Sequence, residues 1–509
     1  MDEALQFKLP HASYEQHTWL LRDEHAPASV APLFSGWVDP DASEAPNSIT
    51  VNGYQYRRSD VPDRNASTRG IAAPISLEHM PRWRPEWGIH IQKLVFGLQR
   101  FDPTTVQPGT WRDVIAEQDV EYGRVFSGVH HSAVLPAVLA VERFLAAHAA
   151  LFGPSRREDA TAMLHGIRNK SIDRAQDLWV LGRFLREQPE LQAALDRKAV
   201  IPDDEVPGAM DLRMGWNAFI DSYGWTTDNG QLDLPNWEEG SPVPLMMVRA
   251  LARQDVSANP REAVRRQTLR RQVLEGELRA LAETDPRAAE LLVLLPMAQQ
   301  ITPNLEDHNL LSDQRLLSGS RKRWLKVGQF LAKQGLLMRA DDVFFMHRIE
   351  VFTALESGQG VGQQELNRRR RAQELYRQMA PPQFLGRPPE GDMPELVMDE
   401  AIQGRSLRGV AAAGGSYRGR ARVIESLEEA GTLVAGDILV VRATTPPWTP
   451  YFGVIGALVA NTGGVLSHGS VVAREYGIPA VVGTRNGTSL IPDGAMVVVD
   501  GTTGHVWVE

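Results

Sequence analysis

A proline-rich segment separates two parts of the chain that differ in composition. Five prolines fall among the fourteen residues from Pro381 to Pro394, and such a run favours an extended, semi-rigid tether. Before it, apolar residues recur at helical spacing and ten of the twelve tryptophans occur. After it, short runs of branched residues alternate with a helical stretch. We therefore predict an α+β multidomain chain: a large, mostly helical domain at 1–380, a linker at 381–405 and a small α/β domain at 406–509.

The periodicity also predicts individual elements. Two long arginine-rich helices with solvated faces are expected near 258–284 and 363–379. In the tail, a helix is expected at 470–476. Strands are expected at 421–424, 438–442, 457–460, 480–482 and 496–500.

Composition excludes several classes of function. The chain has no cysteine, which excludes disulfides, iron–sulfur clusters, thiolate zinc sites and cysteine nucleophiles. With a formal net charge of −9, the chain has no overall excess of basic residues of the kind that binds nucleic acid. The first residues lack a secretory pattern, and the longest apolar stretch, 133–152, contains Glu142, Arg143 and His148. We expect a cytoplasmic protein with no nucleic-acid or membrane partner.

The residues from Asn461 to Gly483 carry the clearest chemical signal. An apolar strand ends in a Gly-Gly turn, and His468 follows just before a helix. The first N–H groups of a helix stabilise an anion, so a phosphate on the His468 ring would suit this place. Glycines allow close backbone approach, and hydroxyls or a guanidinium could bind the phosphate. The residues expected to position or bind this phosphate are Gly463, Gly464, Ser467, Gly469, Ser470 and Arg474. A plain helix-cap or core histidine is the alternative interpretation.

The same string resembles the signature of the mobile phosphohistidine domain in the phosphoenolpyruvate-utilising enzyme family. The matching positions are Thr462-Gly463-Gly464, His468, Ala473-Arg474-Glu475 and 477–483. The resemblance implies that His468 is phosphorylated and that the tail is a swivelling domain moving between two sites. Leu466 and Ser470 depart from the threonine and alanine of several relatives, which implies a different placement of the phosphohistidine. The flanking segment 444–452 resembles a loop of rifampicin phosphotransferases.

Two modules of the larger family members are not expected here. The phosphoenolpyruvate and pyruvate enzymes continue into a large barrel, whereas this chain ends at Glu509; pyruvate and phosphoenolpyruvate are therefore not expected as substrates. The first part shows no P-loop and no glycine-rich phosphate loop between strands. We expect ATP and Mg²⁺ to bind a partner ATP-grasp subunit, as the resemblance to the phenylphosphate synthase branch implies.

The first part resembles the substrate domain of the same two branches. Three patches carry this resemblance: Trp19 to Phe34, Phe219 to Glu239, and Glu306 to Gln314. Trp225-Thr226 replaces a His-Arg pair, and Leu305 stands where an arginine is frequent, which puts basic substrate contacts in doubt. The candidate acceptor-site residues are His130, Trp225, Glu306, Asp307, His308 and Arg315.

Each candidate has a structural alternative. Tryptophans in a helical domain are mostly core residues, and His308, Ser312 and Arg315, which α-helical spacing places on one face, could form a polar network between helices. As the base that activates the acceptor, we consider His308, Asp307 and Glu306. No metal site formed by this chain's own residues is expected.

We therefore expect the phosphohistidine subunit of an ATP-dependent dikinase. His468 takes the phosphoryl group from ATP on the partner and passes it to a small hydroxylated acceptor, and the tryptophan-rich domain favours an aromatic one. Two alternatives stay open: a phosphohistidine relay or regulatory protein without a small-molecule acceptor, and a degenerate scaffold.

Overall fold

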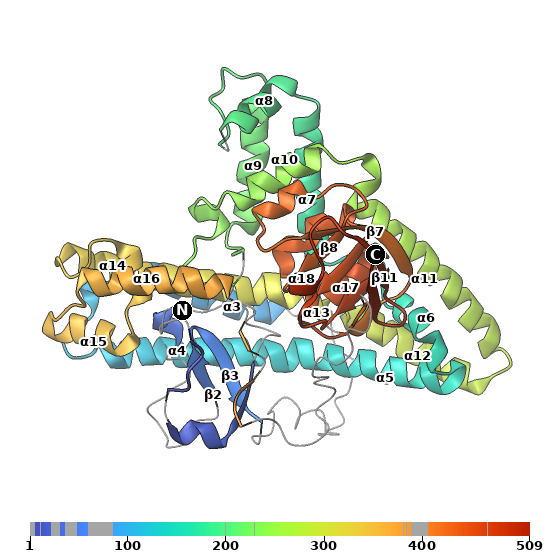
Figure 1. The fold of residues 1–509 in the computed structure, drawn as a ribbon, viewed down its shortest axis with the longest axis horizontal. Helices are drawn as coiled ribbons and strands as arrows, with labels where there is room; N and C mark the ends of the chain where they lie inside the picture. Colours follow the sequence, from blue (N-terminus) through green and yellow to red (C-terminus); the bar gives the residue numbers. More distant parts are fainter. Residues whose placement is uncertain are drawn as a thin grey trace.

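The computed structural model describes residues 6–10, 12–21, 31–35, 48–59, 85–198, 200–228, 230–379, 381–382, 384–387, 406–465 and 467–509. Within this part, long helices spread outward and a compact sheet domain from the C-terminal end lies against them (Figure 1). The predicted class, an α+β multidomain chain with a helical first part and an α/β tail, is confirmed. Most of the predicted linker, 388–405, lies outside the described residues.

A small antiparallel sheet near the N-terminus is the main departure from the predicted helical first part. Its strand order is β2(Ser48–Val51), β3(Tyr54–Arg58), β1(Thr18–Leu21) and β4(Phe384–Gly386). Asn52 and Gly53 both have positive φ, 51° and 78°, as a tight hairpin turn requires. Because β4 pairs with β1, residues 384–386 belong to this sheet and are not the extended tether that the prolines predicted.

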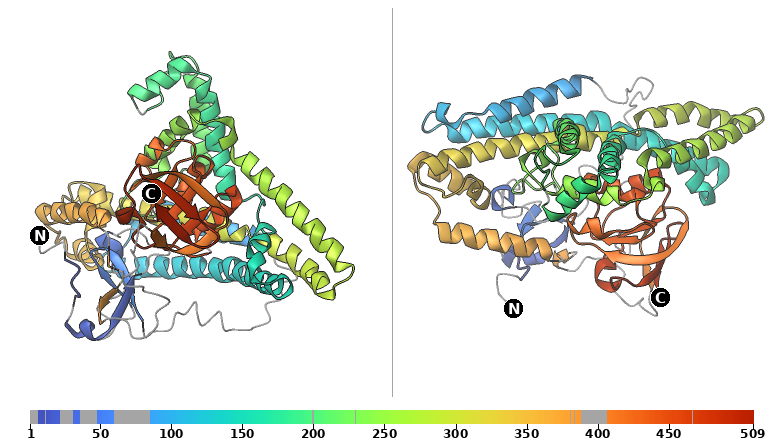
Figure 2. Two further views of the ribbon diagram at one scale, coloured as in Figure 1. Left: turned by 45° about the vertical axis from the view of Figure 1, so that its right-hand side comes forward. Right: turned by 90° about the horizontal axis from the view of Figure 1, so that it is seen from above.

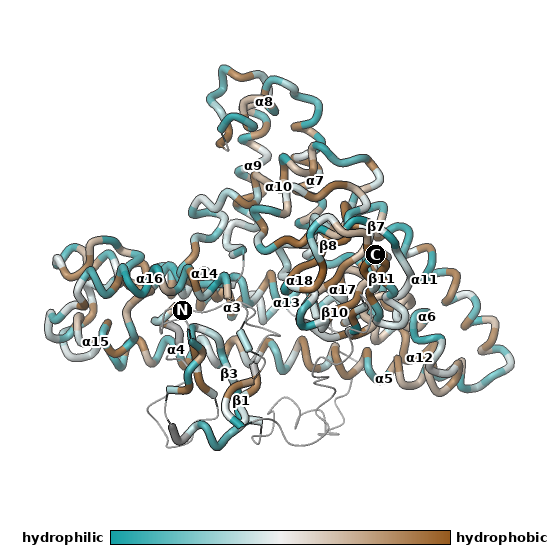
Figure 3. Tube along the Cα trace, in the orientation of Figure 1, coloured by the Kyte–Doolittle hydropathy of each residue, from teal (hydrophilic) through white to brown (hydrophobic). Residues whose placement is uncertain are grey.

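The helical part contains most of the chain. Its longer helices are α3(Pro85–Arg100), α4(Trp111–Val129), α5(Leu135–Phe152), α7(Lys170–Arg186), α8(Pro189–Arg197), α9(Ala209–Tyr223), α10(Val243–Ala252), α11(Pro260–Ala282), α12(Pro286–Ile301), α14(Gln314–Lys333), α15(Arg348–Ser357) and α16(Gln363–Gln378). Shorter ones are α1(Pro32–Ser35), α6(Arg157–Ala162) and α13(Asn304–His308). The two predicted arginine-rich helices are confirmed as α11 and α16, and α16 is largely hydrophilic in Figure 3.

Two long helical runs contain a π-helical turn. The segment His130–Val134 joins α4 to α5, and Asn309–Asp313 joins α13 to α14. Helix α5 packs on α12, and α14 packs on α3; Figure 2 shows these long helices as a layer beside the tail. By length and composition, one helix among the described residues, Trp111–Phe152, is apolar enough to cross a membrane, and 33% of its most apolar window is buried.

The tail contains an eight-stranded sheet with order β5-β12-β11-β7-β8-β9-β10-β6. The strands are β5(Ser406–Arg408), β6(Val410–Ala413), β7(Ser416–Val423), β8(Ile438–Val441), β9(Ala457–Ala460), β10(Ala480–Val482), β11(Met496–Asp500) and β12(His505–Val508). The central strands β7 to β10 are parallel neighbours, and α17(His468–Tyr476) connects β9 to β10. The five predicted strands are confirmed, while β5, β6 and β12 were not predicted.

The tail is docked on the helical part in this structure. One hydrophobic cluster combines buried side chains of α7, α10 and α11 with others from β8, β9, α17 and the loop before β9. Contact is close enough that two glycines of the tail face the helical part directly: a Cβ at Gly453 would lie 2.4 Å from the Ala258 carbonyl oxygen, and one at Gly477 2.1 Å from Gln267 Nε2. The tail therefore packs directly against the helical part.

Candidate active site

His468 lies where the tail meets the helical part. It is the first residue of α17, and its Nδ1 is 2.8 Å from Oε2 of Glu306 in α13. The side chains of His468 and Glu306 are only 11% and 5% exposed. The other ring nitrogen, Nε2, is 3.4 Å from the Thr449 hydroxyl, a weak contact. The sequence predicted both residues, and the structure brings them together from positions far apart in the chain.

The turn before His468 is compact because of its glycines. Gly463 has φ +109°, and a Cβ there would lie 2.8 Å from Ser467 Oγ, so a side chain would meet both backbone strain and a clash. A Cβ at Gly469 would lie 2.4 Å from Thr444 Oγ1, whereas Gly464 faces open space. Gly463 and Gly469 thus allow the chain to fold tightly around the start of α17.

The predicted phosphate ligands of the tail bind backbone in this pose. The Ser467 and Ser470 hydroxyls contact each other at 2.9 Å, and both lie within hydrogen-bonding distance of the Gly464 carbonyl. Arg474 donates to the carbonyl oxygens of Ser470 and Val465. Burial lowers the pKa of Arg474 to about 10, so it stays cationic. In this pose these three side chains hold the turn in shape through backbone carbonyls, and their role as phosphate ligands stays a prediction.

A buried arginine that the sequence did not single out lies close to Glu306. Arg174 of α7 is fully buried; one Nη donates to the Pro446 carbonyl, and its Nε and other Nη have no partner among the described residues. Burial lowers its pKa to about 10, an effect that the nearby Tyr223 and Glu306 partly offset. Two unpartnered cationic donors in a buried position are a strong binding feature for an anion.

The two acidic residues of α13 meet the beginning of α7. Asp307 accepts a 2.6 Å hydrogen bond from the Lys170 N–H, and Glu306 Oε2 accepts one of 3.1 Å from the Ser171 hydroxyl. Carboxylates at a helix N-terminus satisfy its free N–H groups and its dipole. Asp307 is therefore engaged in holding α7, which leaves Glu306 as the carboxylate that faces the histidine.

The predicted face of His308, Ser312 and Arg315 is not formed. The π-helical turn at Asn309–Asp313 adds one residue to the turn, so His308 Nε2 approaches Asp313 Oδ2 at 3.8 Å and Ser312 is fully buried. His130 joins this group, with its Nε2 3.5 Å from the same Asp313 oxygen. Periodicity failed here because it assumed an uninterrupted α-helix.

The titration of these histidines differs. Burial lowers the pKa of His308. Burial also opposes the charge on His130, but the hydrogen bond and charge of Asp313 outweigh it and raise its pKa.

Trp225 and Arg315 form a separate pair: the guanidinium lies 4.1 Å from the indole centroid, and the indole N–H donates to Leu310 O at 3.2 Å. Trp225 and Arg315 thus contact each other beside the same turn.

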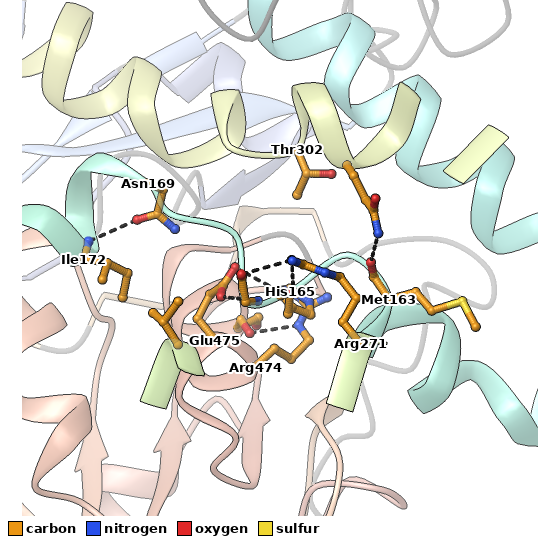
Figure 4. A network of polar contacts seen from close by, with 12 residues as sticks. Met163, His165, Asn169, Ile172, Arg271, Thr302, Arg474 and Glu475 are labelled. Carbon is orange, nitrogen blue, oxygen red and sulfur yellow. Dashed lines mark hydrogen bonds and ion pairs between the residues drawn. The ribbon is translucent and has the colours of Figure 1, made fainter. Parts of the chain in front are cut away.

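A group of polar contacts joins α17 of the tail to the helical part (Figure 4). The Glu475 carboxylate of α17 accepts a 2.9 Å hydrogen bond from the Gly166 N–H and lies 3.2 Å from His165 Nδ1. Arg271 donates to the carbonyl oxygens of His165 and Gly166. Burial lowers the pKa of His165, and Glu475 only partly opposes this shift. Sequence reasoning missed the pair because its members are 310 positions apart.

Comparison with known families agrees with this arrangement. Residues 433–504 match a family described as the mobile domain of PEP-utilising enzymes, and residues 128–304 match the fourth domain of rifampicin phosphotransferase. The first match contains His468 and its glycine turn. The second contains His130, Arg174 and Trp225.

Several curated relatives match much of the chain. Chondramide synthase cmdD of Chondromyces crocatus is 30% identical over 90% of this chain and 12% of its own length. The uncharacterized phosphotransferase YvkC of Bacillus subtilis is 27% identical over 96% of this chain and 62% of its own length. A rifampicin phosphotransferase of Streptomyces sp is 32% identical over 66% of this chain and 40% of its own length. This chain thus spans between 12% and 62% of these relatives. By its motifs, its tail and its helical part, the chain matches the phosphoenolpyruvate-utilising enzyme family, near the rifampicin phosphotransferase branch.

Proposed function

We propose that this chain is the phosphohistidine subunit of an ATP-dependent phosphotransferase. In this proposal His468 receives a phosphoryl group from ATP bound on a partner ATP-grasp subunit and delivers it to a hydroxyl of a small acceptor. The observation that supports it most strongly is the 2.8 Å contact between His468 Nδ1 and Glu306 Oε2, in which the histidine of the family motif meets a buried carboxylate of the other domain.

The contact assigns different tasks to the two ring nitrogens. A carboxylate only accepts hydrogen bonds, so Nδ1 carries the hydrogen and Nε2 keeps its lone pair. Nε2 would therefore hold the phosphoryl group. In the transfer, the Nε2–P bond breaks, the bond from the acceptor oxygen to phosphorus forms, and the hydroxyl proton passes to a base. Glu306 Oε1 makes no hydrogen bond among the described residues and is the base that we propose.

Positive charge beside Glu306 suits a phosphoryl group in transit. The two unpartnered donors of Arg174 and the N–H groups at the start of α17 can bind phosphate oxygens. Positioning and charge stabilisation supply most of the catalysis in phosphoryl transfer. Arg174 is a better candidate for this task than Arg474, whose hydrogen bonds go to backbone carbonyls.

The acceptor must enter when the tail is away from the helical part. Two concavities, of about 320 and 200 Å³, lie beside α8 and between α5 and α11, and neither is lined by His468 or Glu306. In the docked pose the tail itself fills the place next to Glu306. We propose that the tail swings between the partner's ATP site and this station, so that neither substrate must fit beside the other.

ATP and Mg²⁺ belong to the partner subunit in this proposal. Each of these relatives extends beyond the part that matches this chain, so a nucleotide-binding module on the same polypeptide is the alternative to a partner subunit. The acceptor that we favour is a small hydroxylated molecule, and aromatic ones come first in a screen because Trp225 and Trp237 lie close to Arg315 and Arg174.

A direct test uses phosphoramidate, a small phosphoryl donor that reacts with histidine without a partner protein. The full chain is treated, the acid-labile product is mapped by mass spectrometry, and the purified phospho-form is mixed with phenols and alcohols. We expect phosphorylation at His468, no acid-labile product at that site in His468→Ala, and acceptor-dependent loss of label. Phosphorylation without loss of label to any hydroxyl would favour the relay alternative.

A further inference from the structure

Two histidines and an aspartate of the helical part meet beside the π-helical turns. His130 Nε2 lies 3.5 Å and His308 Nε2 3.8 Å from the same oxygen, Asp313 Oδ2, and the three atoms all lie within 4.8 Å of one another. We propose that His130, His308 and Asp313 bind a divalent transition-metal ion. This differs from the sequence prediction, in which the chain's own residues formed no metal site.

The hydrogen bonds of both rings prepare them as ligands. His130 Nδ1 is 2.9 Å from the Phe126 carbonyl, and His308 Nδ1 is 2.8 Å from the Asn304 carbonyl. Because a carbonyl only accepts, each Nδ1 carries the hydrogen and each neutral ring has its lone pair on Nε2. Metal-binding histidines show this same arrangement, in which a hydrogen bond to the distal nitrogen fixes the tautomer and the ring orientation.

Asp313 also has a carboxylate oxygen available to bind an ion. Its Oδ1 is buried and has no hydrogen-bond partner in the described part of the chain, although a buried carboxylate oxygen normally has one. The three side chains are 16% to 30% exposed, so an ion can reach them from solvent. An ion bound to Asp313 would satisfy the free oxygen or its neighbour without moving the backbone.

The spacing fits coordination by one ion. With metal–ligand bonds of about 2.1 Å and tetrahedral angles, neighbouring ligand atoms lie roughly 3.4 Å apart. The 3.5 and 3.8 Å separations require only small side-chain rotations. Three protein ligands leave a position for water or another oxygen ligand. Imidazole ligands favour Zn²⁺, Cu²⁺, Fe²⁺ or Ni²⁺ over Mg²⁺, which prefers oxygen.

Both chain segments reach this geometry through a departure from α-helix. The π-helical segment begins at His130 in one run and ends at Asp313 in the other. In an uninterrupted α-helix, the residue five positions after His308 would lie on another face; the added residue brings Asp313 over it. Single π turns interrupt helices rarely and are frequent at functional sites.

The place of the ion relative to the proposed reaction follows from the chain. Glu306, which contacts His468, lies two residues before His308 in α13. Residues two apart on a helix do not face each other, so the ion would lie close to the proposed acceptor region but on another side of α13 from Glu306. A role for the ion in holding an oxygen of the acceptor rests on the proposed function. Metal binding itself does not, and its test needs no turnover.

The experiment uses the full, tag-free chain after treatment with a chelator. Co²⁺ is titrated at pH 7.5 while its visible absorption is recorded, Zn²⁺ is used to displace it, and bound metal is counted by elemental analysis. We expect one ion per chain, a higher melting temperature with Zn²⁺, and no displacement by millimolar Mg²⁺. His308→Gln and Asp313→Asn should weaken binding at least tenfold.

His131→Gln is the matched control, because His131 is the neighbouring, exposed histidine and its Nδ1 bonds Ser127 O. It should bind Co²⁺ like the unaltered chain. Circular dichroism of each metal-free variant checks folding. Substoichiometric metal in the unaltered chain, or equal binding by His308→Gln and Asp313→Asn, would overturn the proposal and leave a simple ion pair between His130 and Asp313.

Discussion

Replacing Gly453 by alanine should loosen the docking of the tail without damaging either domain. The φ of Gly453 lies outside the left-handed region, so alanine suits its backbone, but the new Cβ would lie 2.4 Å from the Ala258 carbonyl oxygen of the helical part. Ordinary contact begins at 3.4 Å, so the two surfaces must separate locally by about 1 Å. Because the obstacle is backbone, no side chain can turn away to relieve it.

The magnitude follows from overpacking in well-packed contacts, which costs about 1–3 kcal/mol. This corresponds to roughly a 5- to 150-fold shift of the docked–undocked equilibrium toward the undocked form. Since the docked pose leaves the His468 side chain only 11% exposed, undocking should also speed its phosphorylation by phosphoramidate, up to the same factor.

The assay exploits the lack of cysteine in the chain. Single cysteines at the exposed positions Asp221 and Arg408 carry a fluorophore pair that reports the distance between the domains. Gly431→Ala is the control, because a Cβ there meets nothing within 4 Å. The reasoning is refuted if Gly453→Ala and Gly431→Ala give the same energy transfer and the same phosphorylation rate.

Three further predictions follow from the site and the interface. Glu306→Gln should leave phosphorylation of His468 by phosphoramidate intact but slow transfer to the acceptor by roughly 10- to 150-fold, the value of a hydrogen bond to a charged group of about 1.5–3 kcal/mol; equal transfer rates would exclude Glu306. Arg174→Met should slow transfer at least about tenfold with little change in melting temperature, because it removes two buried donors that lack partners and one hydrogen bond to the Pro446 carbonyl, to which Thr449 still donates; a clear fall in melting temperature with normal transfer would make Arg174 structural. The pKa of His165 is lowered, so the folded form resists a proton that the unfolded chain accepts near pH 6.5, and the free energy of unfolding should fall as pH drops below about 6.5. In His165→Gln the free energy of unfolding should fall less between pH 7.5 and 5.5. Identical pH profiles for the two proteins would contradict this.

The sequence was informative where local rules decide the structure. Branched residues predicted the central strands of the tail, and the glycine turn before His468 predicted the start of α17. The N-terminal sheet was missed although its Asn52-Gly53 turn is a strong hairpin signal. Its fourth strand comes from residues 384–386, and no local pattern links those to residue 18.

The site depended on contacts that periodicity cannot give. Glu306 was a candidate through family resemblance, but its meeting with His468 depends on how two domains pack. Arg174 had no local signal, because its importance comes from complete burial with unpartnered donors. The face predicted from His308 was wrong because a π turn changed the spacing. Ser467, Ser470 and Arg474 were assigned to phosphate without knowing that nearby backbone carbonyls would accept their hydrogen bonds.

The central claim is that His468 carries phosphate from ATP to an acceptor, and transfer of label tests it most directly. The chain is incubated with an ATP-grasp partner, Mg²⁺ and ATP labelled at either the β- or the γ-phosphate, and the acid-labile label on the protein is mapped. The resemblance to the dikinases implies AMP and phosphate as co-products, so we predict label on His468 from β-labelled ATP only, and none in His468→Ala. Label from the γ-phosphate, label on another residue, or undiminished labelling of His468→Ala would contradict the account.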